Sequence, residues 1–71
     1  MNNMQYPLTK HQREVLNTID RIINGKGYSP TLTELAKIHK VKIPTMQVLV
    51  KILIQKGYVA RNKKYGQLML L

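Results

Sequence analysis

Apolar residues recur at helical spacing over residues 15–23, where they mark one face of a helix. This stripe consists of Val15, Leu16, Ile19, Ile22 and Ile23. Before it, Thr9 and Gln12 have the spacing of a capping box, in which each side chain satisfies a free backbone amide of the other residue. Gly25 and Gly27 follow the stripe, so the pattern predicts a helix that begins after Thr9 and ends at these glycines.

A second, shorter apolar pattern is formed by Leu32, Leu35, Ala36 and Ile38. Thr31 and Glu34 repeat the capping spacing, which predicts a helix over about Leu32–His39. Because a helix of about eight residues is unstable alone, packing on its neighbours must hold it. Upstream, Pro30 favours extended backbone in the residue before it, so Tyr28–Pro30 is a candidate edge strand.

A third apolar pattern lies between Pro44, which is tolerated in the first turn of a helix, and Gly57, which favours a helix end. It predicts a helix from Ile43 or Pro44 to Lys56. One side of this helix carries Met46, Leu49, Val50 and Leu53, and the opposite side carries Gln47, Val48, Lys51 and Gln55. The first side is therefore predicted to be core and the second a mixed polar surface.

Two short apolar runs, Tyr58–Arg61 and Gln67–Leu71, flank the polar and basic loop Asn62–Gly66. Such a pair of runs around a turn-rich loop predicts a β-hairpin. The predicted fold class is mainly α, with a three-helix bundle followed by a small C-terminal β-hairpin. A chain of 71 residues has room for one domain.

The charge of the chain is strongly positive and uneven. Twelve Lys and Arg residues against three Asp and Glu residues give a net charge of +9. Residues 36–71 carry eight of the bases and no acid. Clustered bases attract a polyanion such as nucleic acid, so the second half of the chain is expected to bind one. The alternative is that these bases serve solubility alone.

Several other classes of protein fit the sequence poorly. Without Cys there is no disulfide framework, and the chain shows no signal-peptide pattern and no apolar run near the roughly 20 residues that cross a bilayer. A cytoplasmic protein with no membrane partner is expected. His11 and His39 lack further metal ligands in sequence, and Ser29 has no neighbouring base. We therefore expect no metal, cofactor, small-molecule ligand or enzymatic activity.

Short motifs occur in a fixed order between Glu34 and Val59: Glu34-Leu35-Ala36, then Thr45-Met46, then Lys56-Gly57-Tyr58-Val59. Their order and spacing resemble the winged helix-turn-helix repressors, and residues 8–71 resemble the N-terminal DNA-binding domain of the LexA repressor family. The resemblance implies a winged helix-turn-helix over residues 8–71, with residues 1–7 as a flexible N-terminus. It also implies that the third helix lies in the DNA major groove and that the hairpin, called the wing, lies on the backbone or minor groove.

The chain departs from that family at three points. Lys40 stands where the turn usually has Gly, so either a non-glycine residue is left-handed there or the turn differs. Lys42 stands where a Ser commonly caps the third helix. The chain closes before the hinge, the dimerising serine–lysine protease domain and the self-cleavage site of the family, so we expect no autoproteolysis.

The exposed side of the third helix supplies the predicted base contacts. Gln47 suits adenine, Val48 suits a thymine methyl group, and Lys51 suits guanine or a phosphate. The other predicted DNA-binding residues are Pro44, Thr45 and Gln55 on this helix, Lys40 and Lys42 before it, and Arg61, Lys63 and Lys64 in the wing. Tyr65 either donates to a phosphate or packs its ring on the hairpin. The alternative for all of them is an ordinary solvated surface.

Together these expectations predict a sequence-specific, double-stranded DNA-binding transcriptional regulator. It is expected to be a prokaryotic protein that associates with the nucleoid and represses by occluding its operator. Ile52, Ile54 and Leu68–Leu71 exceed what a monomer this small is expected to bury, so a homodimer is predicted. The alternative function is a stand-alone winged-helix module, for example phage or mobile-element encoded. Such a module would bind a host protein through its apolar third helix and C-terminal strand.

Overall fold

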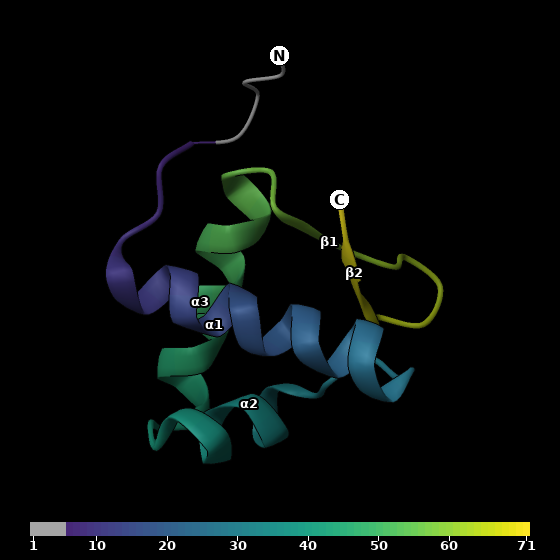
Figure 1. Cartoon of the computed structure of the whole chain (residues 1–71), viewed down its shortest axis with the longest axis horizontal. Coiled ribbons are helices and arrows are strands. Elements are labelled where there is room, and N and C mark those ends of the chain that lie inside the picture. Colours follow the sequence, from purple (N-terminus) through teal and green to yellow (C-terminus); the bar gives the residue numbers. More distant parts are fainter. Residues whose placement is uncertain (1–5) are drawn as a thin grey trace.

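Within residues 6–71 the fold consists of three α-helices and a two-stranded hairpin, as predicted, together with a π-helix that continues the first helix (Figure 1). The computed structural model describes residues 6–71. In chain order the elements are α1 (Lys10–Asp20), the π-helix η1 (Arg21–Lys26), α2 (Leu32–His39), α3 (Ile43–Gln55), β1 (Val59–Arg61) and β2 (Leu68–Leu70). The fold is therefore mainly helical, with the small sheet at the C-terminal end of the chain.

The first helix begins as its capping box predicts and ends differently from the prediction. The Thr9 N–H donates to Gln12 Oε1 at 3.1 Å, and the Gln12 N–H donates to Thr9 Oγ1 at 3.2 Å. From Arg21 the helix widens into η1, which includes Gly25, so this glycine does not end it. The helix stops at Gly27, whose positive φ of 81° is readily adopted by a residue without a Cβ.

The second helix matches its predicted bounds, and the turn after it contains a left-handed residue. Thr31 Oγ1 accepts the Glu34 N–H at 3.0 Å at the start of α2. Lys40 ends α2 with φ 57° and ψ 44°, so of the two alternatives the left-handed non-glycine residue is the one that occurs. Lys42 precedes α3 without a side-chain capping hydrogen bond, and Pro44 occupies the first turn.

The hairpin is antiparallel and pairs Val59 with Leu70 and Arg61 with Leu68. The prediction of an edge strand at Tyr28–Pro30 is wrong, because the sheet within the described residues consists of β1 and β2 alone. The segment nevertheless contacts β2, since Ser29 Oγ accepts the Leu68 N–H at 2.9 Å. A serine hydroxyl thus takes the place of a strand's backbone carbonyl, beside a proline that has no N–H to donate.

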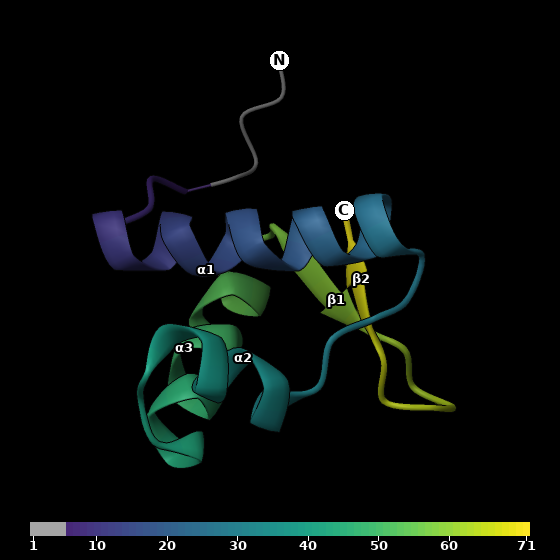
Figure 2. The same ribbon diagram turned by 60° about the horizontal axis from the view of Figure 1, so that its bottom comes forward.

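All three helices and both strands contribute to one hydrophobic core. The buried cluster consists of Val15, Ile19, Leu35, Ala36, Met46, Val50, Leu53, Val59 and Leu68. In Figure 2, α1 runs along the top of the folded part of the molecule, and α2, α3 and the hairpin lie below it. The predicted inner face of α3 is confirmed, since Met46, Val50 and Leu53 are fully buried.

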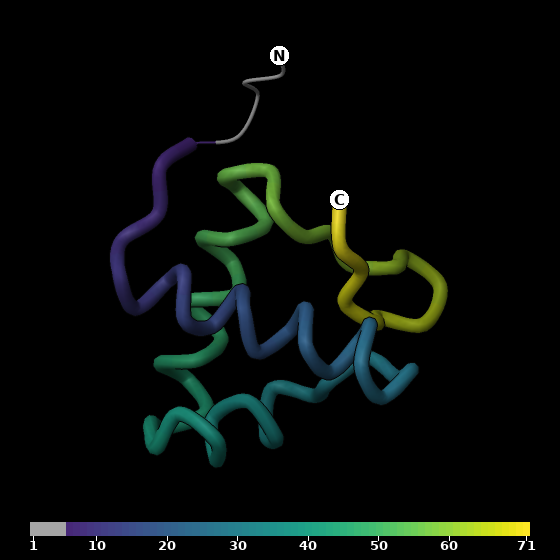
Figure 3. The backbone as a smooth tube through the Cα atoms, in the orientation of Figure 1, coloured from purple at the N-terminus to yellow at the C-terminus, as the bar shows by residue number. Residues whose placement is uncertain are grey.

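The segment before α1 runs beside the end of α3, although the two lie far apart in sequence (Figure 3). The Tyr6 N–H donates to the Lys56 carbonyl, and Tyr58 Oη donates to the Tyr6 carbonyl at 2.6 Å. Lys56 Nζ donates to the Pro7 carbonyl and to Gln12 Oε1, both at 2.8 Å. We call these contacts the N-terminal clasp. Of the predicted flexible residues 1–7, residues 1–5 lie outside the described residues, and Tyr6 and Pro7 belong to the clasp.

Candidate nucleic-acid interface

One side of α3 is exposed along its whole length. Gln47, Lys51 and Gln55 lie on this side, together with Val48, which is 56% exposed. They follow at helical spacing, so they share a face, while Val50 and Leu53 between them are fully buried in the core. The face therefore presents amide groups, one ammonium group and one branched apolar group to any molecule that lies along α3.

The N-terminal end of the same helix is exposed and basic. Lys40 and Lys42 lie in the turn before it, and Pro44 and Thr45 lie in its first turn. The first amides of a helix carry a partial positive charge, so two cations beside them repel that end of the helix. An anion placed there relieves the repulsion and accepts hydrogen bonds from free amides.

The wing loop between β1 and β2 is held in shape by Asn62. Its Oδ1 accepts the N–H groups of Lys64 and Tyr65 at 2.8 and 2.9 Å, and its backbone carbonyl accepts the Gly66 N–H at 2.7 Å. Lys63 and Lys64 are exposed on this loop. Sequence reasoning missed the role of Asn62, although an Asn a few residues before Gly is a known signal for such a turn.

Two further wing residues have partners within the wing itself. Arg61 donates from Nη1 to the Gly66 carbonyl at 3.1 Å, across the base of the loop. Tyr65 is 68% exposed, and Lys64 Nζ lies 5.3 Å from the centre of its ring. The ring is therefore covered in part by a lysine, while its hydroxyl remains available at the surface.

The two predicted DNA-binding regions lie on the same side of α1. Figure 2 shows the α2–α3 unit and the wing loop both extending away from α1. The second half of the chain has no acid, and seven of its eight bases are exposed. The eighth, Lys56, is half-buried and hydrogen-bonded in the N-terminal clasp. Sequence reasoning counted it with the others and missed its internal role.

His39 connects α2 to α1 through a side-chain hydrogen bond. Its Nε2 lies 2.9 Å from Thr18 Oγ1, and the rings of His39 and His11 are 6.0 Å apart. Burial lowers the pKa of His39, and the charges of His11 and Arg21 lower it further, although Glu14 opposes this shift. Within residues 6–71 no three His, Cys, Asp or Glu side chains converge as metal ligands.

The apolar surface available to a partner is smaller than predicted. Ile54 and Leu70 are half-buried against the core, and Leu68 is buried because it points inward from β2. The expectation that a monomer cannot bury all of these residues is therefore wrong for Ile54, Leu68 and Leu70. Met69 and Leu71 remain exposed, at 41% and 70%. No helix within residues 6–71 is long and apolar enough to cross a membrane.

Comparison with known proteins adds an independent finding. The LexA DNA binding domain family matches residues 5–65. The LexA repressor of Thermosipho melanesiensis is 39% identical over 57 residues, which cover 80% of this chain and 29% of that protein. The LexA repressor of Oleidesulfovibrio alaskensis is 30% identical over 61 residues, covering 86% of this chain and 30% of that protein. The chain thus spans less than a third of the length of these relatives.

Proposed function

The chain belongs to the LexA DNA binding domain family, and we propose that it is a sequence-specific, double-stranded DNA-binding repressor. One observation supports this most directly: α3, which carries an exposed polar face, and the basic wing loop both lie on the same side of α1. The proposed role is that of a regulator, which represses by occupying its operator and thereby excluding other proteins from it.

In the proposed complex α3 lies in the major groove, which is wide enough to admit a helix. The Gln47 amide pairs with the N6 and N7 groups of adenine, and Val48 packs on a thymine methyl group. Lys51 donates to guanine or to a phosphate. Pro44, Thr45 and Gln55 border these contacts at the two ends of the helix.

The remaining predicted contacts hold the domain on the DNA backbone without reading sequence. Lys40 and Lys42 meet phosphates beside the start of α3, and Arg61, Lys63 and Lys64 meet phosphates or the minor groove at the wing. Five such contacts correspond to a slope of roughly −4.5 in the logarithm of affinity against the logarithm of salt concentration, at about −0.9 per phosphate.

We also propose that two copies bind together. A single small module buries a limited area on DNA, and two copies with half-sites one helical turn apart add affinity and specificity. The exposed side chains of Met69 and Leu71 are the apolar surface that a second copy would cover. Sedimentation velocity at high micromolar concentration, with and without operator DNA, tests this. A monomer under both conditions contradicts it.

The experiment that tests the function is selection from a random-sequence duplex library at several salt concentrations, followed by sequencing of the bound fraction. An enriched motif with a steep salt dependence supports a sequence-reading repressor. Tight binding without enrichment contradicts sequence reading and indicates an architectural DNA-binding protein.

The second candidate function is a module that binds another protein, and the exposure of Val48, Ile43 and Leu71 favours it. An apolar interface of this kind depends little on salt, because the hydrophobic effect is not screened by ions as charge pairs are. Failure to bind any duplex at moderate salt, together with a stable fold, supports this candidate over DNA binding.

A further inference from the structure

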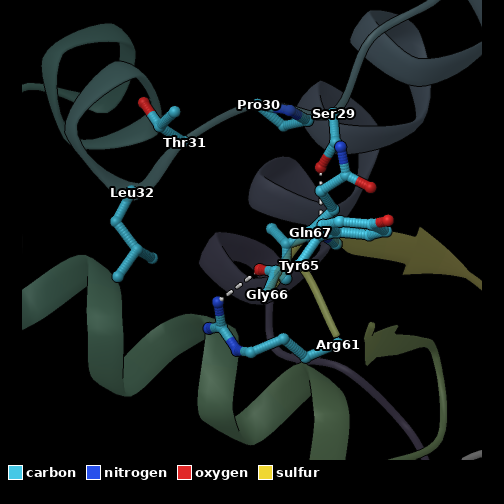
Figure 4. A pocket seen from close by; sticks show the side chains of 9 residues that line it. Ser29, Pro30, Thr31, Leu32, Arg61, Tyr65, Gly66 and Gln67 are labelled. Atoms are coloured by element: carbon cyan, nitrogen blue, oxygen red, sulfur yellow. Dashed lines mark hydrogen bonds between the residues drawn. The ribbon is translucent and has the colours of Figure 1, made fainter. Parts of the chain in front are cut away.

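A groove of about 320 Å³ separates the wing from the linker that leads into α2 (Figure 4). The linker side consists of residues 29–32, and the wing side consists of Arg61 and residues 65–68. In Figure 4 the Arg61 side chain reaches across the groove, and its guanidinium group extends toward the Leu32 side. Residues at least 29 positions apart in sequence therefore form the two walls.

The walls of this groove carry hydrogen-bond donors and one cation, and none of the lining side chains is a carboxylate. Among the described contacts, the Arg61 side chain makes one hydrogen bond, to the Gly66 carbonyl, which leaves the rest of its five N–H donors for a ligand. Ser29 Oγ and Thr31 Oγ1 each accept a backbone N–H, so each retains its own O–H proton to donate. A guanidinium group and two hydroxyl donors that line the same groove suit an anionic, oxygen-rich ligand such as a phosphodiester.

The position of the groove identifies the source of that phosphodiester. The groove lies between the wing and the start of α2, the first helix of the helix-turn-helix. When α3 occupies a major groove and the wing occupies the neighbouring minor groove, the sugar-phosphate strand that divides the two grooves passes between them. We infer that this linker–wing groove seats a phosphodiester of that dividing strand, with Arg61 and the hydroxyl groups of Ser29 and Thr31 as its donors. The inference rests on the proposed function.

Placing a negative charge in the linker–wing groove tests whether this groove binds a phosphodiester. Gln67 lines the groove, is exposed, and its side chain makes no hydrogen bond within the described residues, so Gln67→Glu adds a carboxylate without removing a contact. We expect it to weaken binding to a duplex by about tenfold, because like charges a few ångströms apart repel strongly near a protein surface. Asn17→Asp on α1 makes the same change of charge at the separate groove formed by α1 and the C-terminal strand, and serves as the matched control.

The expected result is a loss for Gln67→Glu that exceeds the loss for Asn17→Asp by at least severalfold, in fluorescence anisotropy with a duplex of fixed sequence. Equal losses overturn the inference, because they reflect net charge alone. If the unmodified protein binds no duplex, the proposed function itself fails, so the two failures are distinguishable.

A second experiment locates the phosphate. Single methylphosphonate linkages, which are neutral, are placed in turn along the selected operator, and each duplex is measured with the unmodified protein and with Arg61→Met. We expect linkages on the strand between the two grooves to weaken binding of the unmodified protein and to have little effect on Arg61→Met. Lys63→Met, a change at the wing tip, is expected to remain sensitive to these linkages. The inference is overturned if Arg61→Met and Lys63→Met lose sensitivity at the same linkages, since Arg61 would then act at the wing tip.

Discussion

At the scale of single residues, Lys56 differs from the exposed bases around it because the protein itself holds its ammonium group. Both acceptors of this group, the Pro7 carbonyl and Gln12 Oε1, belong to the start of the chain. Gln12 also completes the capping box of α1. Lys56 therefore connects the end of the proposed recognition helix to the start of the first helix. We expect these hydrogen bonds to stabilise the folded state.

We predict that Lys56→Met lowers the free energy of unfolding by about 1–3 kcal/mol, the range for hydrogen bonds from a charged group. The Met side chain keeps the apolar part of the lysine and removes only its donors. Urea unfolding followed by circular dichroism measures the change. Lys63→Met, an equal loss of charge at an exposed position, is the control and is expected to leave stability almost unchanged. Similar stability in the two variants would show that the clasp hydrogen bonds contribute little.

We predict that His39 makes the stability of the fold depend on pH. The pKa of His39 lies below its ordinary value in the folded protein because burial and the nearby His11 and Arg21 disfavour the charged ring. The unfolded chain therefore takes up the proton first as pH falls below about 6.5. Stability is thus complete above that pH and decreases as the pH falls from there toward the lowered value.

The measurement is the unfolding midpoint in urea between pH 7.5 and 5.5, with His39→Gln for comparison. Gln keeps a group that can hydrogen-bond to Thr18 and does not titrate, so we expect a flatter pH profile. His11, Glu14 and Arg21 remain in place in both proteins, so their contribution is common to the two profiles. An unchanged slope in His39→Gln would assign the pH dependence to other groups.

At the scale of elements, the turn between α2 and α3 combines strain with function. Lys40 adopts a left-handed conformation at φ 57°, which a residue with a Cβ disfavours. The same residue is a predicted phosphate contact under the proposed function. A comparison of glycine and alanine at this position separates the two effects, because both substitutions remove the charge and only glycine relieves the backbone.

We predict that Lys40→Gly raises the free energy of unfolding by about 0.5–1 kcal/mol. The same variant is expected to reduce the magnitude of the salt slope for DNA binding by about 1, the loss of one phosphate contact. Lys40→Ala is the control, since alanine removes the charge and keeps the Cβ. It is expected to reproduce the binding loss without the gain in stability. A destabilised Lys40→Gly variant would contradict the assignment of strain to this residue.

The helices were predictable from sequence where their signals are local. The bounds of α2 follow from Thr31 at one end and the turn at Lys40 at the other. The π-helix was not predictable, because over six residues the apolar spacing of a widened helix differs little from that of an ordinary one. The expected edge strand failed for a different reason, since Ser29 contacts β2 through its side chain.

The candidate site, like the helices, was predictable where its signals are local in sequence. The exposed face of α3 follows from helical spacing, and the basic wing follows from composition. The linker–wing groove and the N-terminal clasp were not predictable, because each joins residues that lie far apart in sequence and only the folded chain brings them together. Lys56 shows the consequence, since its sequence neighbourhood gives no sign that its charge is used within the fold.

At the scale of the whole molecule, the proposal divides the surface into a part that reads bases and a part that holds the backbone. We predict that Gln47→Ala costs roughly 1–3 kcal/mol of binding free energy on the selected operator and little on random DNA. Lys63→Ala is expected to weaken binding to both by a similar factor, because a phosphate contact carries no sequence information. Titrations of each variant against both duplexes provide the measurement. Equal losses on the two duplexes for Gln47→Ala would remove that residue from base reading.

The N-terminal clasp also bears on how the chain folds. Its side-chain hydrogen bonds join residues 44 to 52 positions apart, whereas the turn between α2 and α3 and the hairpin join close neighbours. Closing a long loop has a larger entropic cost than closing a short one, so the local elements are expected to form before the clasp. Contacts that are absent from the transition state slow unfolding without accelerating folding. We therefore expect the clasp to slow unfolding and so to lengthen the time for which a folded molecule persists.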